Sequence, residues 1–534
     1  MGPHLPTRSA TTRALLDELG PPDFESSFST PLEGVISDRL WELHPKVSLH
    51  LWRMLNEATK TMVPVATPPP SALGVAGQKY LWHVGSLFSG RDISLVVGHY
   101  MCALWKTIAG VDVEIQCVFQ VEMDEEKRAH LLNHTCATHT FDDVSKVASQ
   151  QRLQCFRTKQ DVLLPWAHTL FSGFPCTNRA KTSKTSHLSK GCVQKGTGVT
   201  GNGFGDTFAI VEKQRPRLVI LENVVGLLEQ PGEDEPEEVS DADWIVQQFV
   251  SIGYWAAWFR FDAREYGSFV VRERIYCIAV LHVDLAESAN VSSFAHDVLC
   301  GLKHEPLSVW RFLPEDPVRA RRVSQGIGMP GMQAKQRGSD AANFRDEHFE
   351  LFRLARLPWP VDRDQLDDAY YRLPSTIGDR ALEVSVFLDK AFPASHDVEF
   401  VDVNSNISWL CGFKLGMTTE EFADMMQTSP WSPFPKTMVS RSMMLMRVRN
   451  QYIRILEGWE HMAMVGWDRK NFCPGRSTIS HEGLVSLAGN AFSGFAVFPV
   501  LVAGLGAVGY GKAHRSEGSD AKHQECCYQV FREW

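Results

Sequence analysis

The chain has 534 residues, of which 44% are hydrophobic and 22% charged, and its formal net charge at pH 7 is −9. This balance is typical of a soluble globular protein with several domains. The net charge excludes a uniformly basic protein, but a local basic surface could still bind nucleic acid. The 12 cysteines are scattered, and the opening residues MGPHLPTRSATTRALLDEL carry charges where a secretory leader has an apolar run. We therefore expect reduced thiols and an intracellular protein.

Residues 1–78 are predicted to form an N-terminal appendage that ends in a linker. Helical patterns cover Ala10–Leu19 and Leu49–Ala58, and the second runs into PVATPPPSALG. Clustered prolines stiffen a chain and interrupt helices, so this stretch favours a linker.

Strand and helix patterns alternate from Tyr80 onward. The predicted strands are YLWHVGSLFSG, EIQCVFQVEMD, DVLLPWAHTLFSGF, PRLVILENV, YWAAWFRFDA and RIYCIAVLHV. Helices are predicted between them at ISLVVGHYMCALWKTI, EEKRAHLLNH, TFAIVEKQ and DWIVQQFVSIG. Nearly continuous apolar strands separated by helices predict an α/β fold with a doubly wound, mostly parallel sheet, and such sheets bind ligands beyond the carboxyl ends of their strands.

The glycine-rich segment KGTGVTGNGFGD, residues 195–206, interrupts this pattern. It lacks the Gly-Lys-Ser/Thr ending of a phosphate-binding loop. We predict a mobile loop that closes over a ligand and excludes water.

The alternation is lost over residues 283–445, which we predict to form a second, smaller and irregular α+β domain. It resumes afterwards, so the core is predicted to comprise residues 79–282 and 446–512. Residues 513–534 are predicted to be a polar tail.

Two segments resemble a membrane span and a metal site, but we expect neither. Residues 491–511 carry no charge and are about long enough to cross a membrane. Five glycines and Pro499 in this segment favour a buried helix instead, so we expect no membrane partner. No metal site is expected either, because the histidines and cysteine from His130 to His139 match no standard zinc spacing.

Polar residues that could bind a ligand or take part in catalysis follow the predicted strands. Gly90 follows the first strand in SLFSGRDIS, and Glu122 follows the second, where its carboxylate can accept two hydroxyl hydrogen bonds. Asp143 follows the third strand end in FDDV, with Asp142 as the alternative. Glu222 ends the apolar strand RLVILEN, and a buried acid needs a partner or a chemical role.

Cys176 follows Pro175 in SGFPCTN, directly after an apolar run. A thiolate is a strong nucleophile, and proline stiffens the loop that presents it. Taken alone, a cysteine is more often a buried structural residue than a nucleophile, and the catalytic interpretation of Cys176 depends on the motifs around it. Arg272 and Arg274, two residues apart, lie on one face of the strand VVRERIYCIAV.

The order of these segments resembles the cytosine-5 DNA methyltransferase family, over most of residues 80–281 and 450–505. The resemblance implies a Rossmann-like core that transfers a methyl group from S-adenosylmethionine to carbon 5 of cytosine. It implies that the thiolate of Cys176 adds to carbon 6 of the ring, while Glu222 protonates or hydrogen-bonds N3.

Further residues take supporting roles in this resemblance. Arg272 or Arg274 would hold the carbonyl of the base or Glu222, and Asn223 would brace the cysteine loop. Arg454 and Glu460 keep the family's spacing in a helix that usually organises the recognition domain.

The resemblance places S-adenosylmethionine against the strand ends and against the later motif LAGNAF. The chain departs from the family at residues 91–93, where small residues are expected, and at residues 177–180, which replace a glutamine and a Phe-Ser or Phe-Thr ending. The predicted cofactor-binding residues are Leu87, Phe88, Ser89, Gly90, Glu122, Met123, Asp143, Val144, Pro175, Asn490 and Ala491.

DNA is the partner that the resemblance implies, with the target cytosine flipped out of the duplex and with a nuclear location. Residues 283–445 would choose the target sequence, and the basic residues within 179–195 and 319–322 would hold phosphates. Two alternatives stay open: an RNA methyltransferase that acts on tRNA, and an inactive relative that serves as a DNA-binding or regulatory protein.

Overall fold

The structure, a computed structural model, describes most of the chain between residues 45 and 513. The predicted helix Ala10–Leu19, most of the proline-rich linker, Arg91, residues 319–322 and the tail from residue 514 lie outside the described residues. The described ranges are 45–65, 79–90, 92–106, 111–180, 191–230, 239–281, 288–313, 340–367, 370–373, 379–403, 410–435, 442–467 and 481–513.

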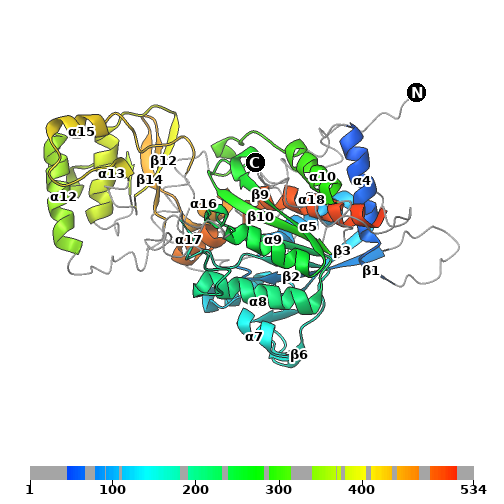
Figure 1. Cartoon of the computed structure of the whole chain (residues 1–534). Coiled ribbons are helices and arrows are strands. Elements are labelled where there is room, and N and C mark those ends of the chain that lie inside the picture. Colours follow the sequence, from blue (N-terminus) through cyan, green and yellow to red (C-terminus); the bar gives the residue numbers. More distant parts are fainter. Residues whose placement is uncertain are drawn as a thin grey trace.

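An eight-stranded sheet forms the centre of the main domain (Figure 1). Its strand order is β4-β3-β2-β7-β8-β10-β9, and a short β1 pairs with β2. The strands are β1 (Val63–Pro64), β2 (Lys79–Leu87), β3 (Asp112–Val121), β4 (His139–Phe141), β7 (Thr169–Ser172), β8 (Leu218–Asn223), β9 (Tyr254–Asp262) and β10 (Glu273–Leu281).

The direction of the strands confirms the predicted fold class, an α/β fold with a mostly parallel sheet. Neighbouring strands from β4 to β8 run parallel, whereas β10 is antiparallel to both β8 and β9. The chain builds β2, β3 and β4 in one direction and then returns to add β7 and β8 on the other side of β2. At such a reversal, which here lies between β2 and β7, doubly wound sheets bind ligands beyond the carboxyl ends of their strands.

Helices cover both faces of the sheet (Figure 1). Along β8, Leu218 and Ile220 pack into one hydrophobic cluster, and the alternating Val219 and Leu221 pack into the other. Both faces are therefore apolar, which explains why the strands read as continuous apolar runs. The first cluster includes α4 (Pro45–Thr59), α5 (Ile93–Leu104), α10 (Ser288–Gly301) and α18 (Gly494–Ala513), and the second includes α7 (Val144–Ser149), α8 (Gly198–Gln214) and α9 (Asp241–Ser251).

The apolar segment 491–511 is a buried helix, as predicted. Within the described residues, one stretch, His481–Tyr510, is long and apolar enough to cross a membrane, and 94% of its most apolar window is buried inside the protein. Its glycines let other backbones come close: a Cβ on Gly509 would collide with the carbonyl oxygen of Met54 on α4. The apolar side chains of α18 are therefore buried in the core of the main domain.

The prediction of a mobile loop over residues 195–206 is wrong, because α8 already begins at Gly198. A Cβ on Gly201 would lie 2.3 Å from the carbonyl oxygen of Cys192, and one on Gly203 would lie 2.7 Å from the Pro175 ring. The glycines thus allow the first turns of α8 to pack against the cysteine loop. Tertiary packing outweighs the low helix propensity of these glycines.

The predicted strand DVLLPWAHTLFSGF is two separate strands. Its first part is β6 (Asp161–Leu163), which forms a hairpin with β5 (Arg152–Gln154), and its last part is β7. Pro165 lies between them and offers no N–H to a sheet, so one continuous strand is disfavoured.

A second domain has its own sheet, in the order β11-β14-β13-β12, and its own hydrophobic cluster. It lies to the left of the main domain in Figure 1 and is α+β, as predicted. Its elements are α12 (Asp340–Leu354), β11 (Tyr371–Arg372), α13 (Asp379–Ala391), β12 (Val398–Asp402), α15 (Thr419–Met425), β13 (Met444–Val448) and β14 (Tyr452–Ile455).

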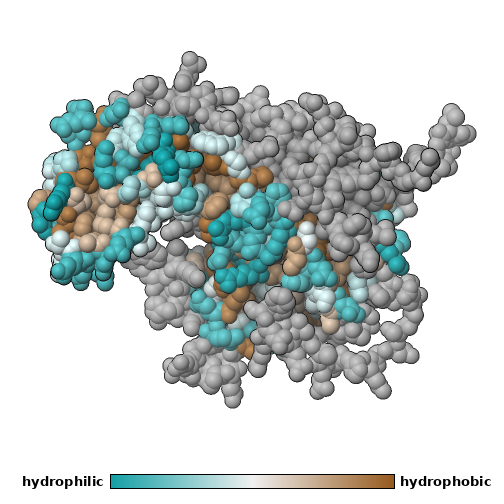
Figure 2. Space-filling model, turned by 90° about the horizontal axis from the view of Figure 1, so that it is seen from above, coloured by the Kyte–Doolittle hydropathy of each residue, from teal (hydrophilic) through white to brown (hydrophobic). Residues whose placement is uncertain are grey.

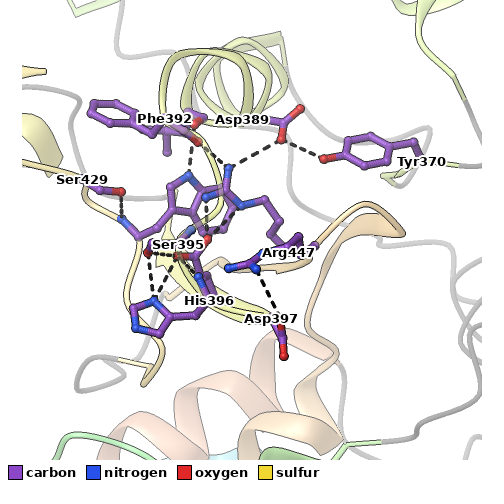
Figure 3. A network of polar contacts seen from close by, with 12 residues as sticks. Tyr370, Asp389, Phe392, Ser395, His396, Asp397, Ser429 and Arg447 are labelled. Atoms are coloured by element: carbon purple, nitrogen blue, oxygen red, sulfur yellow. Dashed lines mark hydrogen bonds and ion pairs between the residues drawn. The ribbon is translucent and has the colours of Figure 1, made fainter.

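A buried polar network joins β12, β13 and α13 of this domain (Figure 3). The guanidinium of Arg447 donates to Glu399 Oε2 at 2.5 and 3.1 Å and to the carbonyl of Phe392 at 2.7 Å. It also stacks 4.1 Å from the ring of Trp431. Arg447 and Glu399 are buried to 2% and 1% side-chain exposure, so this pair is fully enclosed by the domain.

The structure suggests different domain boundaries from those predicted. A division between residues 445 and 446 would cut β13, and the helix α4 of the predicted appendage contributes Leu51 and Leu55 to the main core. We propose that the second domain ends at Ile455 and that α4 belongs to the core.

Candidate active site

The predicted site residues gather at one edge of the main sheet. Strands β2, β3, β4, β7 and β8 are parallel neighbours, so their carboxyl ends and the loops that follow them meet there. The residues that this topology brings to the edge are Gly90, Glu122, Asp143, Cys176 and Glu222.

The cysteine loop is held by its own backbone and by the neighbouring strand. The N–H groups of Arg179 and Ala180 both donate to the carbonyl of Cys176 at 2.9 Å, which closes a turn. Asn223 Nδ2 donates to the carbonyl of Phe174 at 3.0 Å, the bracing contact expected from the sequence. The loop therefore holds the half-buried Cys176 beside the end of β8.

Glu222 and Arg274 form an ion pair next to this loop. Arg274 Nε lies 3.0 Å from Glu222 Oε1, and the two side chains are only 14% and 11% exposed. Burial raises the pKa of Glu222, although the positive charges of Arg274 and Arg272 oppose the rise. A carboxyl group with a raised pKa is suited to proton donation.

The thiol of Cys176 interacts electrostatically with the same charged groups. Burial and the charge of Glu222 raise the pKa of Cys176, whereas Arg274 and Arg272 act to lower it. The predicted nucleophile and the predicted acid therefore share one environment. Because each group affects the ionisation of the other, protonation of Glu222 favours the thiolate of Cys176.

Arg272 contacts the C-terminal part of the chain. Its Nη2 group donates to the carbonyl of Gly489 at 3.2 Å and to that of Ala491. Burial and the nearby Arg274 lower the pKa of Arg272 to about 10. Arg274 is thus the member of the pair that contacts Glu222, and Arg272 ties the LAGNAF segment to the site.

The loop after β2 is tied to the end of β3 by Glu122. The N–H of Gly90 donates to Glu122 Oε2 at 2.8 Å, and the N–H of Asp124 donates to Oε1 at 2.9 Å. A Cβ built on Gly90 would meet nothing within 4 Å, so open space lies beside this backbone. Gly90 itself is buried, so the loop combines a buried backbone N–H, space for further atoms and the neighbouring Glu122 carboxylate.

Asp92 and Ile93, which replace small residues of the family, point into the protein. Asp92 has a φ of 56°, a left-handed conformation that glycine adopts readily and that aspartate tolerates. Its buried carboxylate accepts a hydrogen bond from Gln120 Nε2 at 2.6 Å. Ile93, the first residue of α5, is 1% exposed and packs in the core, so both side chains are buried and neither extends beyond the strand ends.

The other predicted cofactor residues differ in exposure. Asp143 Oδ1 caps α7 by accepting from the N–H of Ser145 at 2.9 Å, whereas Asp142 pairs with Lys146 at 2.8 Å. Met123 and Asn490 are exposed, whereas Leu87, Val144 and Ala491 are buried, and Phe88, Ser89 and Pro175 are half-buried.

Sequence reasoning missed several residues that hold the site. Asn178 and Thr200 exchange two hydrogen bonds between the cysteine loop and α8, and Arg179 and Asp241 form a buried ion pair behind the loop. The sequence did signal that residues 177–180 differ from the family. It could not show that Asn178 and Arg179 contact Thr200 and Asp241, because these partners are brought close only by the fold.

The mostly parallel sheet, with a cysteine and a buried acid at its carboxyl edge, defines a Rossmann-like α/β protein with an enzyme-like site. Residues 103–306 match the family model described as C-5 cytosine-specific DNA methylase. Over these residues the chain matches the family, and the resemblance predicted from the sequence is confirmed. The match includes Glu122, Cys176 and Glu222, whereas the loop after β2 and the LAGNAF motif lie outside it.

Individual relatives are distant. The chain is 24% identical to the DNA-cytosine methyltransferase of Escherichia coli K12 over 262 residues, 40% of this chain and 51% of that protein. It is 24% identical to the type II methyltransferase M.NgoBV of Neisseria gonorrhoeae over 165 residues, 31% of this chain and 34% of that protein. The chain thus spans about half of the length of the first relative and about a third of the second.

A solved structure was also matched, the Dnmt2 methyltransferase of S. pombe. The match has 12% sequence identity and a TM-score of 0.36, and it covers 79% of this chain and 97% of that one.

Replacing Glu122 with alanine is expected to weaken the binding of S-adenosylmethionine by about 10- to 100-fold, the range of one or two lost charge-assisted hydrogen bonds. Calorimetric titration measures the dissociation constant directly. The matched control is Glu125→Ala in the first turn of α6 (Glu125–His134), where the carboxylate is exposed. Equal affinities for the two variants would refute the role of Glu122.

Proposed function

We propose that this protein is a DNA cytosine-5 methyltransferase that uses S-adenosylmethionine. The observation that carries the proposal is the convergence of Cys176, Glu222 and Arg274 at the carboxyl edge of the sheet, inside a segment that matches the family. An ion-paired acid and cation, with a thiol whose ionisation both of them influence, are the groups that addition to a pyrimidine ring requires.

The residues at the neighbouring strand ends fit the cofactor. The open space beside Gly90 admits a ligand against the backbone, and the Glu122 carboxylate stands where it can accept hydrogen bonds from ribose hydroxyls. When bound, S-adenosylmethionine would supply an electrophilic methyl group. Because Asp92 and Ile93 turn inward, the observations favour a working cofactor site over an inactive relative.

In the proposed reaction, the thiolate of Cys176 forms a bond to carbon 6 of cytosine. The electron pair displaced from the ring is stabilised by a proton or hydrogen bond from Glu222 at N3, and carbon 5 becomes nucleophilic. Transfer of the methyl group to carbon 5 would leave S-adenosylhomocysteine. A water molecule then accepts the proton of carbon 5, the bond between carbon 6 and sulfur breaks to release the thiolate, and any proton on N3 returns to Glu222, which restores the ring. Arg274 holds Glu222 in place through this sequence.

A cytosine inside a duplex stacks against its neighbours, so the target must be flipped out to reach Cys176. We assign the choice of that target to the second domain, because it is a separate unit that contacts the segment just before β10, close to Arg272. The N–H of Val271, next to Arg272, donates to the carbonyl of Pro435 at 2.9 Å. On the face seen in Figure 2, its described surface mixes hydrophilic and apolar areas, which suits contacts with both backbone and bases.

Methyl transfer from labelled S-adenosylmethionine to duplex DNA and to tRNA, measured in parallel, tests the proposal. We expect label in 5-methylcytosine of DNA and a strong decrease with added salt. Label in tRNA alone would overturn the DNA assignment in favour of the RNA alternative. No transfer to either substrate, despite measured cofactor binding, would overturn the catalytic proposal.

A further inference from the structure

We propose that Arg179 is a positioning residue that fixes the Cys176 loop relative to Glu222. The inference rests on the proposed function, in which Cys176 is the nucleophile. Arg179 was predicted to belong to a basic cluster that holds phosphates, but its side chain is 1% exposed. A guanidinium enclosed by protein cannot reach a nucleic-acid backbone, so that expectation is wrong for this residue.

The guanidinium ties the cysteine loop to the segment that follows the acid. Its Nη2 group donates to the carbonyl of Gly226 and lies 3.5 Å from the carbonyl oxygen of Glu229. Gly226 belongs to the short helix η3 (Val225–Leu228), which begins two residues after β8 ends. A Cβ on Gly226 would lie 2.3 Å from the carbonyl oxygen of Arg179, so the two backbones are also in contact.

A third segment is joined to this contact through Asp241. Arg179 Nε lies 3.5 Å from Asp241 Oδ2, and the Asp241 side chain is 0% exposed. The other oxygen, Oδ1, accepts from the N–H of Val193 at 3.1 Å and lies 3.4 Å from that of Gln194. The pair therefore connects both flanks of the segment 181–190, which separates the cysteine loop from α8.

Asn178 makes a parallel connection beside Arg179. Its N–H donates to Thr200 Oγ1 at 3.2 Å, and its Oδ1 accepts from the N–H of Thr200 at 3.0 Å. The residues just after Cys176 are thus bound to α8, to η3 and to the start of α9. The resemblance predicts a phenylalanine near this position, and a phenylalanine offers no hydrogen-bond donors. A planar guanidinium has donors in fixed directions, so it fixes the orientation of the loop as well as its distance from η3.

The test uses the full chain and three variants. Arg179→Met removes the guanidinium but leaves Asp241 buried and unpaired, which can destabilise the fold. The double variant Arg179→Met/Asp241→Asn removes both charges and keeps an oxygen for the N–H groups of Val193 and Gln194. Arg447→Met is the matched control, because Arg447 is an equally buried, ion-paired arginine in the second domain.

Three measurements separate an effect on positioning from an effect on stability. The pH dependence of iodoacetamide labelling, followed on the Cys176 peptide, gives the pKa of this thiol without any methyl transfer. Assays with DNA give kcat and KM, and melting gives Tm. In the wild type, burial and Glu222 hold the pKa of Cys176 above its ordinary value of 9.0.

We expect both Arg179 variants to bring the pKa of Cys176 down towards 9.0 and to lower kcat by at least about tenfold, because small misplacements of reacting groups are costly. The dissociation constant of S-adenosylmethionine should stay as in the wild type. The Arg447→Met variant should lower Tm and leave the pKa of Cys176 unchanged.

A wild-type pKa and kcat in the double variant would overturn the inference, as would an equal effect of Arg447→Met on the pKa. Failure of the proposed function has a different signature. If the wild type transfers no methyl group to DNA or tRNA, the labelling experiment still reports whether Arg179 holds the Cys176 loop.

Discussion

Replacing Cys176 with serine is expected to abolish covalent capture of a duplex that contains 5-fluorocytosine and to lower methyl transfer about a thousandfold or more. A serine hydroxyl is not ionised near neutral pH, so no strong nucleophile is left to attack carbon 6. The two side chains are close in size, and we expect little change in Tm. Denaturing gels detect the covalent complex, and labelled cofactor measures the transfer.

Cys136→Ser is the matched control for this substitution, because Cys136 is an exposed cysteine that the proposal gives no role. It should capture the duplex as the wild type does. If Cys176→Ser forms the covalent complex, another residue is the nucleophile and the proposed function fails.

The capture rate of the wild type should also depend on pH in a defined way. The pKa of Cys176 lies above 9.0 through burial and the charge of Glu222, so the thiolate is a minor species at neutral pH. Below that pKa the thiolate fraction rises about tenfold per pH unit, and we expect the rate of iodoacetamide labelling to rise with it. A rate independent of pH from neutral to pH 9 would contradict the raised pKa.

Replacing Glu222 with glutamine is expected to move two measurements in opposite directions. Methyl transfer should fall by about 10²- to 10⁴-fold, because a positioned general acid is lost. Labelling of Cys176 at pH 8 should become faster, because Glu222 raises the pKa of the thiol and its removal leaves Arg272 and Arg274 unopposed. A purely structural acid would not produce this combination.

The control is Glu273→Gln. Glu273 precedes Arg274 on β10, and its carboxylate is 43% exposed and paired with Arg260. It should alter neither measurement by more than a small factor. In the wild type, the raised pKa of Glu222 keeps its acid form populated at pH values above the ordinary 4.5. Activity that needs this acid form must decline as the pH rises through the raised pKa, and Glu222→Gln should remove that decline.

Much of the main domain could be predicted because its signals are local. The helix Glu125–His134 coincides with the predicted EEKRAHLLNH, with acids in its first turn and an Asp124 cap. The apolar run of β8 ends at an acid, and a parallel sheet with both faces covered requires such runs. Glu222 could therefore be assigned to a strand end from sequence alone.

Where the sequence failed, tertiary contacts outweighed local preference. The glycines of α8 suggested a loop, but they are the residues that let a helix pack against Cys192 and Pro175. The boundary that we propose for the second domain differs from the predicted one for a similar reason. Strand β13 acquires its identity from pairing with β12, which lies far from it in the chain.

The sequence by itself determined the alternation of most core strands and helices, and it placed the candidate cysteine, acid and arginine pair along that order, since each of these signals depends on neighbours within a few residues. Only the tertiary structure decided what the arginines do. Arg272 reaches Ala491 and Arg179 reaches Asp241 across long stretches of chain, and both are enclosed by protein. An arginine that binds phosphate must be exposed, whereas one that orders a loop is buried and paired with a distant residue. Neither burial nor a distant partner can be read from the neighbouring residues in the sequence.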